Sequence, residues 1–398
     1  MSDGPLAGVS VVEMTGHRAG PFCGALLADM GAEVVKIERP GVGDPARSQG
    51  IGPDGKSGYF MANNRNKRSV TVDLKSDAGR EAALELLATA DVFVENFGYG
   101  VTDALGIGAE TVRERNPGLV YASIKGYGET GPAKERPGLD LILQAEAGIM
   151  SVTGPAGGEP VKVGQAIGDL TTGMFAVIGI LARLYERDRT SSFTGGFDVG
   201  IFDAIVSLLN EYLTEYSMDG SVPGPQGASH QTLVPYQRFE TADEPIVTGV
   251  PSDDRWPAFV GMVGRDELHQ YETNRDRREN VESVVEIVQE AFASESSEYW
   301  LDRLTDAGFP CGPINDVEAV VDHEQTRARD LVVAHDDPDW GECLLPGHPI
   351  NFHDYDGDIR RPAPRLGEHT DAVFADVAED QSTLDRWADG GAFGSVTE

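Results

Sequence analysis

The chain of 398 residues carries 66 acidic and 32 basic side chains, which give it a formal net charge of −34 at pH 7. The acids are dispersed, and we interpret them as a surface adapted to a high-salt cytoplasm, because salt screens their repulsion. The absence of a basic stripe argues against nucleic-acid binding. No signal-peptide pattern opens the chain, the apolar run at 174–184 is shorter than a membrane span, and the three cysteines fit neither a zinc site nor a redox pair. We therefore expect a cytoplasmic protein without membrane contact or metal.

The first third of the chain predicts strands that alternate with helices. The predicted strands lie at 8–15, 31–38, 67–74, 91–97 and 118–126, and the predicted helices lie at 21–30, 78–90 and 109–117. This alternation indicates an α/β fold with a doubly wound, Rossmann-like parallel sheet. Ligands of such sheets bind at the carboxyl ends of the strands.

Residues 161–187 place one carboxylate, Asp169, just before a long apolar run. Asp is a favoured helix N-cap, so the side chain either caps a helix or takes part in chemistry. A helical pattern follows over 198–218, and Gly, Pro and Ser then interrupt it.

Later in the chain the regular alternation of strands and helices ends, which predicts a second domain. A hairpin over 239–250 is followed by helical patterns near 256–263 and 281–293. Extended segments and a last helix over 369–377 end the chain. We divide it into a large α/β domain (1–220), a linker (221–231), a smaller α+β domain (232–320) and a linker with a C-terminal return to the large domain (321–398).

The sequence lacks the characteristic motifs of several enzyme classes. The first βαβ turn spaces Gly16, Gly20 and Gly24 as G-x3-G-x3-G, which differs from the dinucleotide-binding fingerprint. No G-x-S-x-G elbow, P-loop or H-E-x-x-H motif is present. All seven lysines lie within the first 162 residues, which indicates that an anionic ligand binds in this part of the chain.

Eight segments, taken in order, resemble the class III coenzyme A transferases, a family that includes formyl-CoA:oxalate and carnitine CoA-transferases and is related to α-methylacyl-CoA racemase. These segments are AGPFCGALLADMGAEVVKIERPGVGDPAR, NRNKRSVTVDLK, VENFGYG, NPGLVYASIKGYGETGP, RPGLDLILQAEAGIMSVTG, GQAIGDLTTGMFAVIGILARLYER, GFPCGPINDVEAVVDHEQTRAR and APRLGEHTDAV. The resemblance implies a homodimer of two interlocked chains and no permanent cofactor, with CoA thioesters as substrates.

The resemblance also implies roles for individual residues. It makes Asp169 the nucleophile. The positions that match the family's CoA contacts are His17, Arg18, Ala19, Arg39, Val72, Lys75, Asn96, Phe97, Gly98, Lys125, Arg136 and Asp140. A carboxylate at a helix N-terminus should stay ionised. It could then attack a thioester carbonyl, while backbone N–H groups of a glycine loop stabilise the oxyanion.

Other interpretations of these residues stay open. Arg39 and Lys75 either neutralise CoA phosphates or are solvated surface charges. Asn96 and Phe97 either border the pantetheine or adenine or serve in a turn and in packing.

Three positions depart from the family pattern. Leu139 stands where the racemases have a catalytic His, which argues against racemisation. Ala104 replaces an Arg that several relatives use near CoA. Arg18 replaces an aliphatic or amide side chain, and its guanidinium could hold a second carboxylate, contact a CoA phosphate or form a surface salt bridge.

We therefore expect an enzyme that moves CoA from an acyl-CoA, succinyl-CoA in our prediction, to a free four- or five-carbon dicarboxylate such as mesaconate. The alternatives are intramolecular CoA transfer between the two carboxyls of one diacid, a racemase-like enzyme and a non-catalytic acyl-CoA-binding protein.

Overall fold

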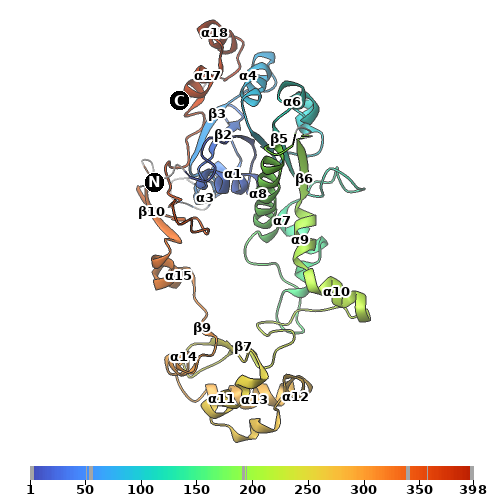
Figure 1. Ribbon diagram of the computed structural model, residues 1–398, viewed down its shortest axis with the longest axis vertical. Helices are drawn as coiled ribbons and strands as arrows, with labels where there is room; N and C mark the ends of the chain where they lie inside the picture. Colours follow the sequence, from blue (N-terminus) through green and yellow to red (C-terminus); the bar gives the residue numbers. More distant parts are fainter. Residues whose placement is uncertain are drawn as a thin grey trace. The chain divides into compact units, whose positions relative to one another are not determined.

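The computed structural model describes residues 4–50, 52, 57–190, 193, 195–337, 341–355 and 357–394 (Figure 1). Its contacts divide the chain into two compact units. The first unit comprises Met1–Ile149, Val163–Thr214 and Glu324–Glu398, and the second comprises Met150–Lys162 and Glu215–His323. Residues 150–162 and 215–220, which our sequence division assigns to the large domain, belong here to the second unit.

The first unit is built on a parallel sheet of six strands, ordered β3-β2-β1-β4-β5-β6. The strands are β1 (Ser10–Met14), β2 (Glu33–Glu38), β3 (Lys67–Thr71), β4 (Val92–Glu95), β5 (Val120–Lys125) and β6 (Gly196–Gly200). The order reverses beside β1, as in a doubly wound fold. The predicted α/β class with a parallel sheet is confirmed.

Helices cover both faces of this sheet (Figure 1). The helices α1 (Ala19–Asp29) and α8 (Ile167–Arg187) pack on one face. On the other face lie α4 (Asp77–Ala88), α6 (Ala109–Arg115), α17 (Thr370–Val377) and α18 (Gln381–Asp389). Burial on both faces explains why the strands read as nearly continuous apolar runs.

Shorter helices complete the first unit and position its loops. They are α2 (Ala46–Gln49), α3 (Gly58–Asn64), α5 (Val101–Ala104), α7 (Asp140–Glu146), α9 (Ile201–Leu208) and α10 (Asn210–Asp219), the last of which crosses the boundary between the units. The predicted helix over 198–218 was wrong at its start, because residues 198–200 belong to β6 and pair with β5. A short glycine-containing edge strand lacks the alternation by which strands are recognised.

The second unit has an antiparallel sheet and its own aromatic core. Its sheet consists of β7 (Tyr236–Phe239), β8 (Ile246–Gly249) and β9 (Cys311–Pro313), so the predicted hairpin is confirmed. Its helices are α11 (Trp256–Val263), α12 (Asn274–Glu279), α13 (Val281–Phe292), α14 (Ser297–Asp306) and α15 (Val317–Asp322). The side chains of Phe239, Phe259 and Phe292 pack together at its centre.

The C-terminal segment packs against the first strands of the chain. After α16 (Glu324–Ala328) and the hairpin of β10 (Val332–Asp337) and β11 (Gly341–Pro346), it runs along β3. The backbone N–H of Thr71 donates to Thr370 Oγ1 at 3.0 Å, and that of Asp73 donates to the carbonyl of Ala392 at 2.7 Å. The predicted last helix is therefore not the last, since α18 follows it.

By length and composition alone, α8 is apolar enough to cross a membrane. This differs from our expectation, which rested on the shorter run at 174–184. The helix nevertheless serves as a core element of the first unit, because Ala176, Ile180 and Leu184 are buried in one cluster with α1 and the sheet.

Candidate active site

Asp169 lies in the first turn of α8 but does not cap it. The helix begins at Ile167, its N-cap position is Ala166, and no side chain at that position accepts a capping bond. The exposed N–H groups are satisfied by another carboxylate, since Asp140 Oδ1 accepts from the backbone N–H of Gly168 at 2.9 Å and of Asp169 at 3.3 Å. The capping interpretation of Asp169 is wrong, and its carboxylate is left available for other contacts.

Two features hold Asp140 at this helix terminus. Gln144, fully buried on α7, donates from Nε2 to Asp140 Oδ2 at 2.7 Å and accepts from the backbone N–H of Val163 at 2.9 Å. Gly168 leaves room for the approach, because a Cβ atom there would lie 3.0 Å from Asp140 Oδ1 and 2.8 Å from Ile201. Gly168 is thus needed for close packing at the start of α8, next to the Asp169 carboxylate.

The surroundings of Asp169 favour its neutral form more than we expected. Burial and, to a smaller extent, the negative charge of Asp140 raise the pKa of Asp169 to about 7, although the positive charge of Arg18 opposes them. The helix dipole therefore does not keep the group fully ionised at neutral pH. A carboxylate with a pKa of about 7 is a stronger base than an ordinary one, and this basicity favours nucleophilic attack.

Arg18 stands at the N-cap position of α1, and its positive charge acts on Asp169. Its Nη1 donates to Gln165 Oε1 at 3.1 Å, and its guanidinium lies 4.6 Å from the ring centre of Tyr59. Burial raises the pKa of Tyr59 to about 12, so the phenol stays protonated at neutral pH. A cation and a hydroxyl group thus accompany the nucleophile candidate, and sequence reasoning did not single out Tyr59 or Gln165.

The loop before α1 is tied to two other loops. The side-chain amide of Asn96 accepts from the backbone N–H of Gly16 and donates to its carbonyl, both at 2.8 Å. The next residue, His17, has a positive φ of 63°, and its backbone N–H donates to Asp44 Oδ1 at 3.0 Å. The amide of Asn96 is therefore engaged within the protein, while the side chain of His17 is exposed.

Other predicted contacts are also engaged within the protein. Lys125 is buried and pairs with Glu95 at 2.5 Å, and Arg136 pairs with Glu146 at 2.7 Å. Val72 and Ala19 are 2% and 3% exposed, so only their backbone could meet a ligand.

A third group remains accessible at the carboxyl edge of the sheet. The side chains of Arg39 and Lys75 are exposed and have no polar partner within the described residues. They follow β2 and β3, and Phe97, 38% exposed, and Gly98 follow β4. Because the strands are parallel, these residues lie at one edge of the sheet.

The clustering of lysines has a structural explanation in part. Lys36 and Lys67 are fully buried and ion-paired, and Lys125 is 6% exposed. A buried ammonium paired with a carboxylate cannot be removed without leaving a charge uncompensated. These three lysines therefore do not by themselves indicate an anionic ligand.

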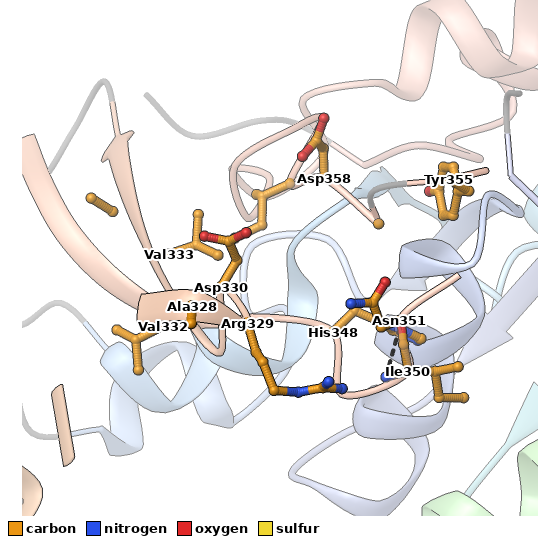
Figure 2. A pocket seen from close by; sticks show the side chains of 13 residues that line it. Ala328, Arg329, Asp330, Val332, Val333, His348, Ile350, Asn351, Tyr355 and Asp358 are labelled. Atoms are coloured by element: carbon orange, nitrogen blue, oxygen red, sulfur yellow. Dashed lines mark hydrogen bonds between the residues drawn. The ribbon is translucent and has the colours of Figure 1, made fainter. Parts of the chain in front are cut away.

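A separate hollow of about 570 Å³ lies in the C-terminal segment of the first unit (Figure 2). It is lined by the polar residues Arg329, Asp330, His348, Asn351, Tyr355 and Asp358 together with apolar side chains. None of the predicted site residues lines it.

Comparison with known proteins identifies the family. The sequence profile described as CoA-transferase family III matches residues 6–370. This chain belongs to CoA-transferase family III. It is therefore an enzyme, a class III CoA-transferase whose substrates include CoA thioesters.

Named relatives in the family cover nearly the whole chain. A succinyl-CoA:mesaconate CoA-transferase of Haloarcula marismortui is 38% identical over 96% of this chain and 98% of its own length. The human succinyl-CoA:glutarate CoA-transferase is 36% identical over 94% of this chain and 86% of its own length. The crystal structure of a CAIB/BAIF family protein from Brucella suis is 35% identical, with a TM-score of 0.83 over 95% of this chain and 100% of that protein.

Proposed function

We propose that this transferase moves CoA from succinyl-CoA to a four- or five-carbon dicarboxylate such as mesaconate, with Asp169 as the nucleophile. One observation carries the proposal. A half-buried carboxylate with a pKa of about 7 lies in the first turn of α8, beside the Arg18 guanidinium. The names of the relatives in Haloarcula and human support the choice of a succinyl donor and a diacid acceptor.

In the first half of the proposed reaction, an Asp169 oxygen attacks the thioester carbonyl of succinyl-CoA. The C–S bond breaks, and a mixed anhydride and the CoA thiolate form. The thiolate then attacks the Asp169 carbonyl carbon of the anhydride. This step releases succinate and leaves an aspartyl-CoA thioester.

The second half repeats these steps with the acceptor. A carboxylate of the acceptor attacks the aspartyl thioester, which releases the thiolate and forms a second anhydride. Attack of the thiolate on the acceptor's carbonyl carbon gives the new acyl-CoA and regenerates the Asp169 carboxylate. The first half needs the Asp169 carboxylate ionised, and the second needs the carboxylate of the acceptor ionised. Both halves pass through oxyanions that N–H donors stabilise.

We assign the second carboxylate of the diacid to Arg18. A guanidinium has five N–H donors in a planar fork; one donates to the side chain of Gln165 at 3.1 Å, and another bonds to the hydroxyl of Tyr59. The remaining donors can bind a carboxylate in bidentate fashion. The neighbouring phenol of Tyr59 offers a further O–H donor.

For CoA we propose a path along the carboxyl edge of the sheet. The exposed cations of Arg39 and Lys75 would bind phosphates, and Phe97 and Gly98 would border the pantetheine or adenine. Ala19 and Val72 would contribute backbone groups. His17, Asn96, Lys125, Arg136 and Asp140 stay in the proposed contact set, although the last four also hold the site together through internal bonds.

We further propose a homodimer of interlocked chains in the cytoplasm, with the linker and domain boundaries given by the sequence. An apolar stripe on α8 supports the dimer, since Met174, Ile178, Leu181 and Tyr185 are 36–65% exposed at helical spacing. Large exposed apolar stripes favour association. Light scattering should give twice the mass of one chain, and Ile178→Asp should lower that mass; a monomeric wild type would contradict the proposal.

The test of the reaction combines an acceptor panel with trapping. Succinyl-CoA and a series of mono- and dicarboxylates are incubated with the enzyme at molar salt, and the acyl-CoA products are identified by mass. Hydroxylamine added during turnover should convert Asp169 to a hydroxamate, and Asp169→Ala should abolish both transfer and trapping. At a pH well above the acid limb, where Asp169 is ionised in both proteins, Arg18→Gln should raise KM for diacids about 10-fold or more relative to KM for monocarboxylates. Turnover with an unmodified Asp169 would contradict the proposed mechanism.

A further inference from the structure

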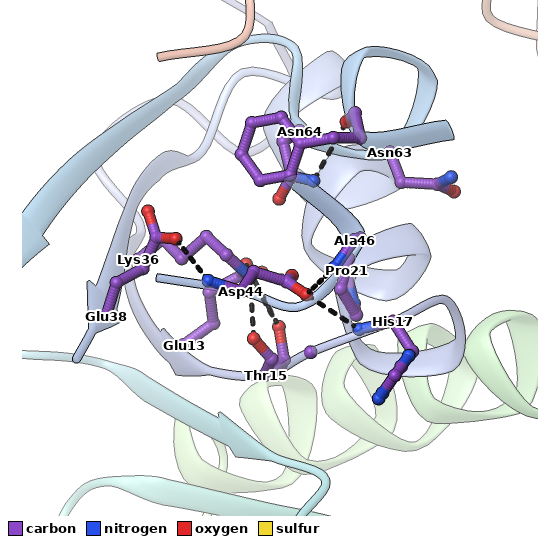
Figure 3. A network of polar contacts seen from close by, with 12 residues as sticks. Glu13, Thr15, His17, Pro21, Lys36, Glu38, Asp44, Ala46, Asn63 and Asn64 are labelled. Carbon is purple, nitrogen blue, oxygen red and sulfur yellow. Dashed lines mark hydrogen bonds and ion pairs between the residues drawn. The ribbon is translucent and has the colours of Figure 1, made fainter. Parts of the chain in front are cut away.

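The loop that carries Arg18 lies over a buried network of charges (Figure 3). Glu13, Lys36 and Lys67 are 0% exposed, and Asp44 is 4% exposed. Two carboxylates and two ammonium groups balance one another, as burial of charge requires. None of these four residues was singled out as a site residue from the sequence.

Glu13 joins the two lysines. Its Oε1 lies 3.2 Å from Lys36 Nζ and 2.9 Å from Lys67 Nζ. Its Oε2 accepts a second bond from Lys67 at 3.0 Å. The network thus links three parallel strands, because these residues lie on β1, β2 and β3.

The two ammonium groups also hold both ends of the loop between β1 and α1. Lys36 Nζ donates to the carbonyl of Thr15 at 2.7 Å, where the loop begins. Lys67 Nζ donates to the carbonyl of Pro21 at 2.7 Å, inside the first turn of α1. The path of residues 15–21 is therefore set by groups that have no access to solvent.

Asp44 connects this network to the middle of the loop. Its Oδ2 lies 3.1 Å from Lys36 Nζ, and its Oδ1 accepts from the backbone N–H of His17 at 3.0 Å and of Ala46 at 2.9 Å. Burial opposes ionisation of Asp44, but Lys36 and these N–H groups together hold its pKa below the usual value. The acceptor therefore stays charged, and charge-assisted bonds are the stronger kind.

The hydrogen bond to Asp44 stabilises an unfavourable backbone conformation at His17. His17 has φ of 63°, in the left-handed region that residues other than glycine rarely occupy. Its ring points away from Asp44 (Figure 3), so the contact is made by the backbone alone. Because Arg18 follows directly, the conformation of His17 sets the direction in which Arg18 leaves the backbone.

We propose that Asp44, held by Lys36, is a positioning residue for CoA transfer, which keeps His17 in the left-handed conformation that directs Arg18 toward Asp169. This inference rests on the proposed function, and it adds a group that contacts neither the substrate nor the nucleophile. Loss of the Asp44 charge should let the loop relax and move the Arg18 guanidinium away from Asp169.

The test compares Asp44→Asn with Asp29→Asn. Asp29 is also buried in the first unit and ion-paired, with Arg65 Nη2 at 2.5 Å, but it has no contact with residues 15–18 among its hydrogen bonds. Asp44→Asn should lower kcat about 10-fold more than the control does. It should also move the acid limb of the pH profile of kcat/KM to higher pH by about half a pH unit. The reason is that the Arg18 guanidinium moves away from Asp169, and the pKa of Asp169 then rises. The control should lower the melting temperature without moving the limb.

A second pair of variants tests the inference in case Asp44→Asn fails to fold. Asp44→Glu and Asp29→Glu keep the buried charge, and only the former displaces the acceptor of the His17 N–H bond. The same shift of the acid limb is expected for Asp44→Glu alone. If the acid limb of kcat/KM lies at the same pH in the wild type and in both Asp44 variants, the inference is wrong. Hydroxylamine trapping on the wild type separates this outcome from failure of the proposed function, which would leave Asp169 of the wild type unmodified.

Discussion

Asp169 is the residue whose ionisation has the most direct consequences for activity. Burial and the charge of Asp140 raise its pKa to about 7, and Arg18 opposes them. Since the ionised form is the nucleophile, kcat/KM should fall about tenfold per pH unit below pH 7. Arg18→Gln should move this limb to higher pH, and Asp140→Asn should move it to lower pH.

The two opposite shifts can be measured with acceptor acids that are fully ionised above pH 6, so that only the enzyme titrates. Asn at position 140 can still accept from the N–H groups of Gly168 and Asp169, so the helix terminus keeps its partner. If the acid limb lies at the same pH in the wild type, Arg18→Gln and Asp140→Asn, a group other than Asp169 controls the pH profile.

The same pKa predicts how Asp169 affects stability. A folded-state pKa of about 7, above the ordinary 3.8, means that the folded protein binds the proton more tightly than the unfolded chain does. The stability that this provides is fully present below about pH 4 and is lost as pH rises through about 7. Asp169→Asn should therefore be more stable than the wild type at pH 8, by about 1 kcal/mol after allowance for partial solvent access.

Urea unfolding at pH 8 and pH 5 measures this difference, which should shrink at the lower pH. Such a gain in an inactive variant is expected where a functional group is held at a cost to stability. A variant that is less stable than the wild type at pH 8 would contradict the prediction.

At the scale of secondary structure, the contact between α1 and α8 aligns the two sides of the site. Gly173 on α8 allows it, because a Cβ atom there would lie 2.8 Å from the carbonyl oxygen of Ala19 and 3.0 Å from the ring of Phe22. Gly173→Ala should therefore push the helices apart, destabilise the protein by about 1–3 kcal/mol and lower kcat, since α1 carries Arg18 at its N-cap.

Gly261 on α11 provides the matched control. It is also a helical glycine, but apart from its chain neighbours and the backbone of its own helix, no atom lies within 4 Å of the position of its Cβ. Gly261→Ala should be neutral or stabilise by up to about 1 kcal/mol, as helix propensity predicts. Equal effects of the two substitutions in denaturant unfolding would show that helix packing at Gly173 is looser than the structure indicates.

The elements themselves were predictable where local pattern determines them. The first five strands and the helices at α1, α4 and α6 follow from periodicity, because both faces of the sheet are buried. The edge strand β6 was missed, since its pairing with β5 depends on residues about 75 positions away. The cap of α8 was missed for the same reason, because Asp140 comes from a different helix.

At the scale of the whole molecule, the sequence motifs were enough to predict the family and the α/β sheet. They could not indicate which charged residues face a ligand. The clustering of the lysines indicated an anionic ligand in the first 162 residues, but three of these lysines, Lys36, Lys67 and Lys125, are buried in ion pairs. Their partners Glu13 and Glu95 lie on strands that become neighbours only in the folded sheet.

The net charge of −34 leads to a prediction for the entire chain. Repulsion among the dispersed acids opposes folding at low ionic strength, and the Debye length shrinks from about 10 Å at 0.1 M salt to about 3 Å at 1 M. The melting temperature should therefore rise by on the order of 10 °C between about 0.1 M and about 2 M KCl.

A pair of denaturants separates screening from a general salt effect on apolar burial. Guanidinium chloride is ionic and urea is neutral, although both weaken the hydrophobic effect. In low-salt buffer, the first few tenths molar of guanidinium chloride should raise the melting temperature by screening, whereas urea should only lower it. If both denaturants lower the melting temperature from the first addition and KCl leaves it unchanged, then charge repulsion does not limit the stability of this protein, and adaptation to high salt is the wrong interpretation of its composition.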